Sequence, residues 1–522
     1  MRRCLILCVS LLVLFSCNRE SMDDFMEDER SAAEVSHDMI VLGKQLEDPY
    51  SVDNVTRALE SLYPVRSSRY DVTPTDIYVR FLPADEAEYH ELVAMGIEML
   101  DHPLDYQIIR DGDYYRDPEL EDNQITWQYA VLEKDFKLPE HIRHEVLDDC
   151  FIPEHDGETR SDGLDWTAIV REAYRLTGNE ELLEPYTRSG RSKPHGRITI
   201  EDASYAGGKP LGVAGVKVIC NSFVKFSSCY TNSAGEYEMP RDFGSKVRYR
   251  LMFKNEAGFS IGLNLVLVPA SSSALGKGSP EGIDVHITAA SDRKLFCRSV
   301  VNNAMSDYLA RCQSDDLNLT KPPMGIRIWI MQKLSESSSV MMHHGAVLEA
   351  SLLDHYFGDY MKILSVFLPD ITIGAKDKLS YADLYSEVIH ECAHASHFSR
   401  TGTDFWNTYA FYILQSFVTT GDSYGSGVGP EAGFCEVGEM WAYFMENVFC
   451  HDRYGTQMDK GNYFWFHPQI FTFLYERGLS VSDLFSALGT EICSIGLLRN
   501  RLVELYPDKE ILIDQAFDAY VE

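Results

Sequence analysis

The stretch that most constrains the fold of this chain is residues 381–398, which read YADLYSEVIHECAHASHF. It contains His390 and His394, and side chains four residues apart lie on one face of an α-helix, where two imidazoles can share one metal ion. Apolar residues such as Val388 and Ile389 supply the rest of the helix surface, so the pattern predicts a largely buried helix with a polar stripe. Because neutral imidazole suits zinc, the sequence predicts a zinc site on this helix.

The residue between the two histidines, Glu391, completes the pattern H-E-x-x-H. Its carboxylate projects beside the two imidazoles, where it can take a proton from a water molecule whose pKa a zinc ion has lowered. We therefore expect Glu391 to be the general base of a hydrolytic reaction.

A zinc site that does chemistry needs a third protein ligand and leaves a fourth position open for water. His397 lies two helical turns beyond His390, roughly 10 Å along the axis, which is too far to bind the same ion. We expect His397 beside the cleft or at a polar helix end. The metzincin pattern requires a histidine where this chain has Arg400, and this excludes that group of enzymes.

Residues 434–449, FCEVGEMWAYFMENVF, predict a second amphipathic helix that offers the missing ligand. Glu436 and Glu439 lie on one face of it, and either carboxylate could reach the metal ion. The two helices resemble those of gluzincin metallopeptidases, in which a glutamate on a second helix completes the site, often within an E-x-x-A segment followed by aromatic residues. Residues 439–444, EMWAYF, match that segment. The resemblance favours Glu439 as the ligand, with Glu436 as the alternative.

The resemblance covers roughly residues 290–522 and is specific only at the two helices. Thermolysin-like gluzincins carry an aspartate four positions after the ligand, where this chain has Tyr443. The resemblance implies a mostly helical, zincin-like domain that hydrolyses peptide or protein substrates. It also implies that the strand before the first helix is a sheet edge that pairs with extended substrate. Ile371–Ala375 is the candidate for that edge strand, and an ordinary buried strand is the alternative.

A glycine-rich loop, GDSYGSGVG, lies between the two helices at residues 421–429. It lacks the Lys and Ser/Thr ending of a phosphate-binding loop. Near a metal site such a loop could act as a lid, and Tyr424 in it or His467 further along could donate a hydrogen bond to the oxyanion of a transition state. Packing is the simpler role for both side chains.

The length of 522 residues predicts a multidomain α+β protein of about three or four domains. Residues 36–190 read as an N-terminal α/β domain. In it, a strand at 77–82, a helix from Pro83 to Val93 and a strand at 97–100 form a predicted β-α-β unit, and a further helix spans 166–176.

Residues 195–289 consist of short alternating runs separated by Gly and Asn turns, which predicts a small β-sandwich. Residues 231–240, TNSAGEYEMP, resemble a hairpin of carboxypeptidase regulatory-like, transthyretin-type modules, and this implies a transthyretin-like or Ig-like fold. Such a module is more often a spacer than a site, and a contact to carbohydrate or protein is the alternative role. Residues 290–522 then form the zincin-like domain.

Residues 1–17 predict a lipoprotein signal peptide, because two arginines precede an apolar run too short to span a bilayer. Residues 14–17, LFSC, resemble a bacterial lipobox, in which Cys17 is lipidated. The acidic tether at 18–35 resembles the export tag of surface lipoproteins in Bacteroides-like bacteria. The resemblance implies a protein that is anchored through Cys17 at the outer membrane or cell surface, outside the cytoplasm.

With 47 basic and 80 acidic residues, the chain has a formal net charge of −33, which repels nucleic-acid phosphates, so we expect no nucleic-acid partner. Three of the twelve cysteines fall within residues 1–17, and the other nine do not read as a disulfide framework. Cys220 and Cys229 are the nearest candidate pair. We expect Cys392, within the first helix, to be a small core residue.

Two functions fit these features. The first is a zinc-dependent peptidase outside the cytoplasm, with His390, His394 and Glu439 as zinc ligands and Glu391 as the base. The alternative is a non-catalytic cell-surface binding protein that uses a zincin scaffold and the β-sandwich module. The presence of Glu391 favours the peptidase, since a scaffold has no use for it.

Overall fold

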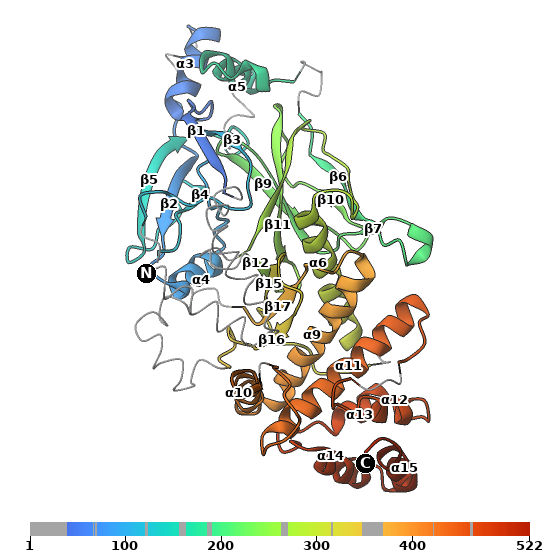
Figure 1. Ribbon diagram of the computed structural model, residues 1–522. Coiled ribbons are helices and arrows are strands. Elements are labelled where there is room, and N and C mark those ends of the chain that lie inside the picture. Colours follow the sequence, from blue (N-terminus) through green and yellow to red (C-terminus); the bar gives the residue numbers. More distant parts are fainter. Residues whose placement is uncertain are drawn as a thin grey trace.

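The computed structural model describes residues 39–65, 67, 70–120, 124–155, 163–184, 191–262, 270–314, 317–346, 369–420, 422–459 and 463–521. It is a mixed α+β structure whose C-terminal region is helical, with the N-terminal elements at one end, the largest sheet in the middle and the C-terminal helices at the other end (Figure 1). The predicted signal peptide, Cys17 and the acidic tether lie outside the described residues. No helix among the described residues is long and apolar enough to cross a membrane.

The N-terminal region contains a three-stranded antiparallel sheet in the order β4 (Gln128–Glu133), β2 (Asp76–Leu82) and β5 (Arg143–Cys150). Helix α4 (Glu86–Ala94) follows β2 and is capped by Asp85. The predicted β-α-β unit is wrong, because both neighbours of β2 are antiparallel strands and residues 97–100 form only an isolated bridge. The short apolar run at 97–100 contributes to the core without entering the sheet.

The predicted helix at 166–176 is confirmed as α5 (Trp166–Leu176), which packs against α3 (Val52–Leu62). Both helices are strongly amphipathic, and their apolar faces form a small core of their own. Strands β1 (Val41–Gln45) and β3 (Tyr106–Arg110) form a separate antiparallel pair.

The largest sheet is built from β8 (Val216–Ser222), β9 (Lys225–Tyr230), β11 (Val247–Asn255), β12 (Ser260–Gly262), β13 (Ser272–Gly278), β15 (Arg327–Met331), β16 (Ser338–Ser339) and β17 (Ile371–Gly374). The strand order is β16-β17-β15-β12-β11-β8-β9, and β13 also pairs with β11. Because β12 pairs in parallel with β15, one sheet runs across residue 290, where we predicted a domain boundary.

A smaller sheet contains β6 (His195–Ile200), β7 (Leu211–Gly212), β10 (Glu236–Glu238) and β14 (Val285–Ile287). Ile198 and Tyr237 of this sheet share a core with Val218 and Leu251 of the largest sheet. The same core continues into the helices that follow residue 290. The β-rich region and the helical region are therefore joined by a common sheet and a common core.

Strand β17 is an inner strand, so the prediction that Ile371–Ala375 forms the sheet edge is wrong and the alternative of a buried strand is confirmed. It pairs in parallel with β15 on one side and antiparallel with β16 on the other, and all four of its residues are buried. Within the described part of the chain, β16 is the edge strand at this end of the sheet, and its Ser338 and Ser339 lie opposite Thr372 and Ile371.

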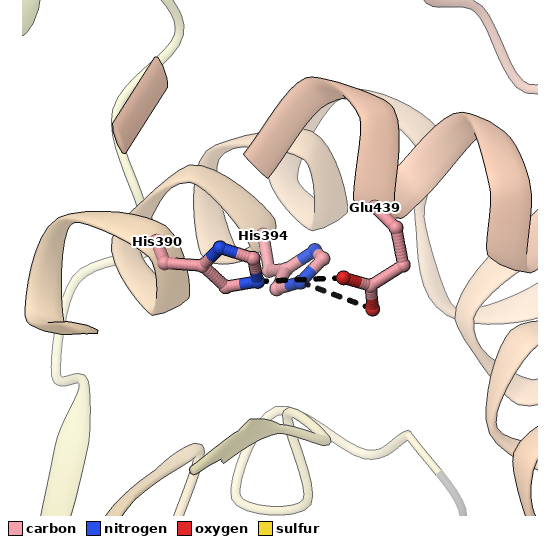
Figure 2. Close-up of side chains that lie close together, drawn as sticks. All are labelled: His390, His394 and Glu439. Carbon is pink, nitrogen blue, oxygen red and sulfur yellow. Dashed lines mark ion pairs between the residues drawn. The ribbon is translucent and has the colours of Figure 1, made fainter. Parts of the chain in front are cut away.

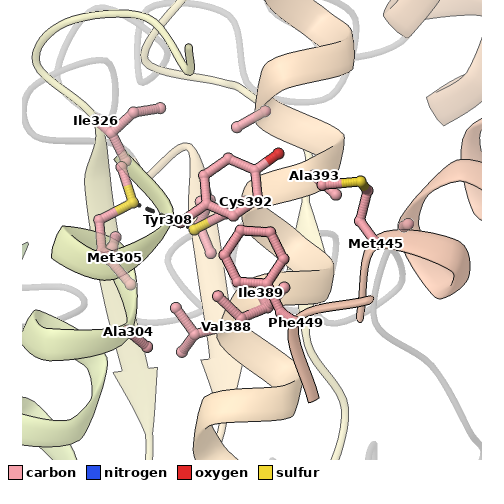
Figure 3. Close-up of a cluster of buried hydrophobic side chains, with 14 of the residues drawn as sticks. Ala304, Met305, Tyr308, Ile326, Val388, Ile389, Cys392, Ala393, Met445 and Phe449 are labelled. Atoms are coloured by element: carbon pink, nitrogen blue, oxygen red, sulfur yellow. Dashed lines mark hydrogen bonds between the residues drawn. The ribbon is translucent and has the colours of Figure 1, made fainter. Parts of the chain in front are cut away.

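Three long helices follow in this part of the chain: α6 (Arg293–Cys312), α9 (Tyr381–Thr401) and α11 (Ala432–Tyr454), of which α9 packs on β16 and β17. Helix α9 contacts both of the others, and Figure 3 shows the buried cluster where they meet. In it, Cys392 of α9 is fully buried with its Sγ 3.2 Å from Met305 Sδ of α6, which confirms Cys392 as a core residue. Burying side chains such as Tyr308 and Phe449 at this junction contributes about 1.5–3 kcal/mol each, so the packing fixes α9 firmly.

The remaining helices are α10 (Thr403–Thr420), α12 (Gln469–Tyr475), α13 (Val481–Ser486), α14 (Ile495–Leu505) and α15 (Glu510–Tyr520). Helix α10 packs against α9 and α11, while α12 and α14 pack on α11. All nine cysteines of the described residues are free thiols, so the candidate pair Cys220–Cys229 is wrong. Cys220 lies opposite Ser227 across the β8–β9 ladder, and Cys229 lies opposite Val218.

Candidate metal centre

Helix α9 carries the H-E-x-x-H residues in its middle, and both of its ends are defined by local sequence. Ser380 and Asp383 form a capping box at the N-terminus, in which each side chain accepts a hydrogen bond from the main-chain N–H of the other. Gly402 ends the helix with φ of 80°, a conformation that glycine adopts easily. The helix is therefore held in one register, with His390 and His394 facing α11.

The side chains of His390, His394 and Glu439 converge between α9 and α11 (Figure 2). His390 Nε2 lies 3.4 Å from Glu439 Oε2, and His394 Nε2 lies 3.5 Å from Glu439 Oε1. One possible ligand atom from each residue lies within 4.8 Å of the other two. All three residues are buried, so the structure brings together the three predicted ligands away from bulk water.

These distances fit a metal ion bound by all three side chains. Ligand atoms about 2.0–2.1 Å from one tetrahedral zinc ion lie on the order of 3.3 Å from each other. Glu439 Oε2 has no hydrogen-bond partner among the described residues, and a buried carboxylate oxygen is costly unless a donor or a cation compensates it. Burial by itself would raise the pKa of Glu439, but the two imidazoles beside it hold that pKa well below its usual range. The residue is therefore present as the carboxylate that a metal ion requires.

Helix α11 also orients His390 through Nδ1, the ring nitrogen that does not face Glu439. His390 Nδ1 lies 3.1 Å from Glu446 Oε2, and Ser386 Oγ donates a hydrogen bond of 2.5 Å to the other oxygen of the same carboxylate. The ring of Tyr443 meets the ring of His390 edge to face, with centroids 4.6 Å apart. An imidazole that donates from Nδ1 to a carboxylate keeps a lone pair on Nε2, the atom that faces Glu439.

Tyr409 of α10 holds the third predicted ligand in place. Its hydroxyl donates a hydrogen bond of 2.5 Å to Glu439 Oε1, and its ring lies against that of His394 with centroids 5.9 Å apart. Trp406, one turn earlier on α10, also packs against His394, with ring centroids 5.4 Å apart. Tyr409 could not be predicted from the sequence, because α10 is rich in aromatic residues and nothing in its pattern distinguishes this one.

We expect Tyr409→Phe to weaken zinc binding about 10- to 100-fold, because the variant removes only the hydroxyl that orients Glu439 while the ring remains to pack. Competition with a chromogenic chelator measures the affinity. Tyr412→Phe is the matched control, since its hydroxyl donates to the main-chain oxygen of Tyr424 and not to Glu439. Equal zinc affinity for Tyr409→Phe and the wild type would contradict this role.

Glu391 lies in the wall of the same site and is only 4% exposed. Burial raises the pKa of Glu391 to about 8, and a cation at the centre would lower it again. Its Oε2 has no hydrogen-bond partner among the described residues. A buried carboxylate with one oxygen that no protein group binds can accept a proton from water, as a general base does.

A cavity of about 200 Å³ opens onto the three converging side chains and Glu391. One wall is the edge segment, residues 336–340, which includes β16. Ser339 of this segment donates a hydrogen bond of 2.8 Å to the main-chain oxygen of Glu391, which ties the sheet edge to α9. The opposite wall comes from α10 and from residues 422–424 of the glycine-rich loop.

The two predicted hydrogen-bond donors lie in different places. Tyr424 lines the cavity, and its main-chain oxygen accepts hydrogen bonds from Tyr412 and from Trp465 Nε1, both at 3.0 Å, so this part of the loop is anchored. His467 does not line the cavity; its Nδ1 lies 2.8 Å from Glu436 Oε1. The structure thus pairs the alternative ligand Glu436 with His467 and brings neither to the metal-binding group.

His397 is fully buried among aromatic rings, with ring centroids 5.0 Å from Phe405 and 6.0 Å from Trp406. The expectation that it lies beside the cleft or at a polar helix end is therefore wrong. Phe405 and Trp406 of α10 cover this face of α9. The sequence of α9 alone could not predict that α10 packs there.

Compared with protein-family models, with curated proteins and with solved structures, the chain shows no significant match. The case for a function therefore depends on the residues of the site.

Proposed function

We propose that this protein is a zinc-dependent peptidase that hydrolyses peptide bonds outside the cytoplasm. The observation that supports it most is the convergence of His390, His394 and Glu439 beside the buried carboxylate of Glu391 at the wall of one cavity. Two imidazoles, a carboxylate and a separate glutamate on the histidine helix are the groups that H-E-x-x-H zinc hydrolases use.

Zinc, when bound, supplies a Lewis acid that lowers the pKa of water and polarises a substrate carbonyl. Glu391 accepts the proton of the attacking water and then donates it to the leaving amine. Glu446 and Tyr409 keep His390 and Glu439 in fixed orientations throughout, because each holds its partner by a hydrogen bond from outside the centre.

The edge strand β16 provides a surface for an extended peptide. No strand of the described residues pairs with its outer edge, and its residues line the cavity. A peptide that adds to this edge through main-chain hydrogen bonds would run past Glu391, because Ser339 connects the edge to that residue. This arrangement favours a peptide or protein substrate.

Turnover of a mixed peptide library tests the proposal, with zinc-loaded wild-type protein and Glu391→Gln compared at equal zinc content. A non-catalytic binding protein, the alternative, would cleave no peptide in either form. Cleavage by the wild type that the variant lacks supports the peptidase.

We also propose that the protein is anchored through Cys17 at the outer membrane or cell surface; the sequence of residues 14–17 and the acidic tether support this. Cys17→Ala should move the protein from the membrane fraction to the soluble fraction, because the lipid on this thiol is the proposed anchor. Immunoblots of fractionated cells measure the distribution, with Ser16→Ala as the control that keeps the cysteine. A Cys17→Ala protein that still sediments with membranes would contradict the anchor.

A further inference from the structure

The lining of the cavity is acidic, and the edge segment, residues 336–340, contributes one of its carboxylates. Glu336 of this segment is partly exposed and lines the cavity, and Asp422 of the glycine-rich loop also lines it. Among the described residues, no Lys or Arg side chain lines the cavity. A substrate that enters it therefore meets carboxylates at the mouth as well as at the centre.

The position of Glu336 is fixed by close packing of its main chain on β17. A Cβ atom built on Gly374 would lie 2.3 Å from the main-chain oxygen of Glu336, so only glycine permits this approach. The main-chain N–H of Gly374 also donates a hydrogen bond of 3.0 Å to Ser337 Oγ. The main chain at Glu336, which carries the side chain into the cavity lining, is therefore held in a fixed position.

Negative charge at this wall exceeds the positive charge that could offset it. Burial and the carboxylate of Glu387 raise the pKa of Glu336, Lys378 lowers it in part, and Asp377 raises it further. Lys378 is itself engaged, with its Nζ 2.6 Å from Glu387 Oε2. Glu387 precedes Glu391 by one helical turn, so its side chain lies on the same face of α9 as the proposed base.

A second observation at the same cavity also points to a cationic ligand. Glu391, more than nine-tenths buried, lines the cavity, and one oxygen of its carboxylate has no hydrogen-bond partner among the described residues. Apolar side chains line the cavity beside the carboxylates, including Ala410, Ile413 and Phe464. A cavity lined by apolar residues and carboxylates suits a Lys or Arg side chain. Its methylene groups can pack against the apolar residues while its charged end reaches a carboxylate.

We infer that the cavity selects peptides with Lys or Arg within one residue of the cleaved bond, and that Glu336 binds the cationic end of that side chain. The inference rests on the proposed peptidase function and adds a substrate class to it. Glu336 is here a specificity-determining residue and takes no part in the chemical step.

A peptide library with cleavage sites read by mass spectrometry, followed by matched peptides that carry Lys or norleucine at the selected position, tests the inference. We expect the wild type to cleave next to Lys and Arg in excess. Glu336→Gln should lower kcat/KM for the Lys peptide about fivefold to tenfold and leave the norleucine peptide unchanged, because the carboxylate is partly exposed to solvent. Glu336→Lys should lower it about 100-fold, since it places like charges together.

Glu60→Gln, which removes an exposed carboxylate on the distant helix α3, should change neither peptide. Wild-type cleavage that is indifferent to Lys and norleucine would overturn the inference while peptidase activity stands. So would an equal loss on both peptides in Glu336→Gln, which would indicate a structural role. No cleavage of any peptide by zinc-loaded wild type would overturn the peptidase proposal and this inference together.

Discussion

Glu391→Gln is expected to reduce peptide turnover about a thousandfold while one zinc ion stays bound per chain. The amide cannot accept the proton of an attacking water, and general acid-base catalysis by a positioned group contributes about 10²–10⁴-fold. Zinc binding should persist because the converging ligand atoms belong to His390, His394 and Glu439. Initial rates on one peptide substrate, together with zinc content by mass spectrometry, measure the two effects separately.

The size of Gln matches that of Glu, so the buried position 391 should tolerate the change without a cavity. Glu60→Gln is a suitable control for the handling of the variants, because it replaces an exposed carboxylate far from the site. Turnover within about threefold of the wild type in Glu391→Gln would exclude this residue as the base.

His390→Ala, His394→Ala and Glu439→Gln should each lose most of the bound zinc and nearly all activity. Each change removes one of three protein ligands and leaves an incomplete coordination shell. The loss should also abolish stabilisation by added zinc, because a ligand that binds only the folded state raises the melting temperature. Zinc per chain after dialysis and thermal unfolding with and without zinc are the two measurements.

Glu436→Gln is the matched control for Glu439→Gln, since the two residues lie one turn apart on α11. Glu436 contacts His467 and not the converging imidazoles, so its variant should keep one zinc per chain. Full zinc occupancy in any of the three ligand variants, or zinc loss confined to Glu436→Gln, would contradict the assigned ligand set.

The convergence of His390, His394 and Glu439 could be predicted because it depends on helix geometry. The four-residue spacing of His390 and His394 places both rings on one face of α9 whatever surrounds it. The position of Glu439 on its helix could be predicted in the same way, because the apolar residues of that helix recur with a clear helical period. The choice between Glu439 and Glu436 depended on the resemblance, since both carboxylates share one face and only the packing of α11 on α9 separates them.

The parts that could not be predicted depend on contacts between distant segments. Strand β16 has two serines and no alternation of apolar and polar residues, so nothing local marks it as the sheet edge. Strand β12 is three residues long, yet its parallel pairing with β15 joins regions that composition separates. Tyr409 reaches Glu439 only because α10 folds back over α9 and α11, which no periodicity in its own sequence indicates.

We propose that one zinc ion, held by His390, His394 and Glu439, makes this chain a peptidase. Titration of the metal-free wild-type protein with zinc, with peptide turnover followed at each addition, tests it most directly. We expect activity to rise linearly, to stop rising at one zinc ion per chain, and to be absent throughout the same titration of Glu391→Gln. Turnover that is independent of added zinc, or no turnover with zinc fully bound, would contradict it.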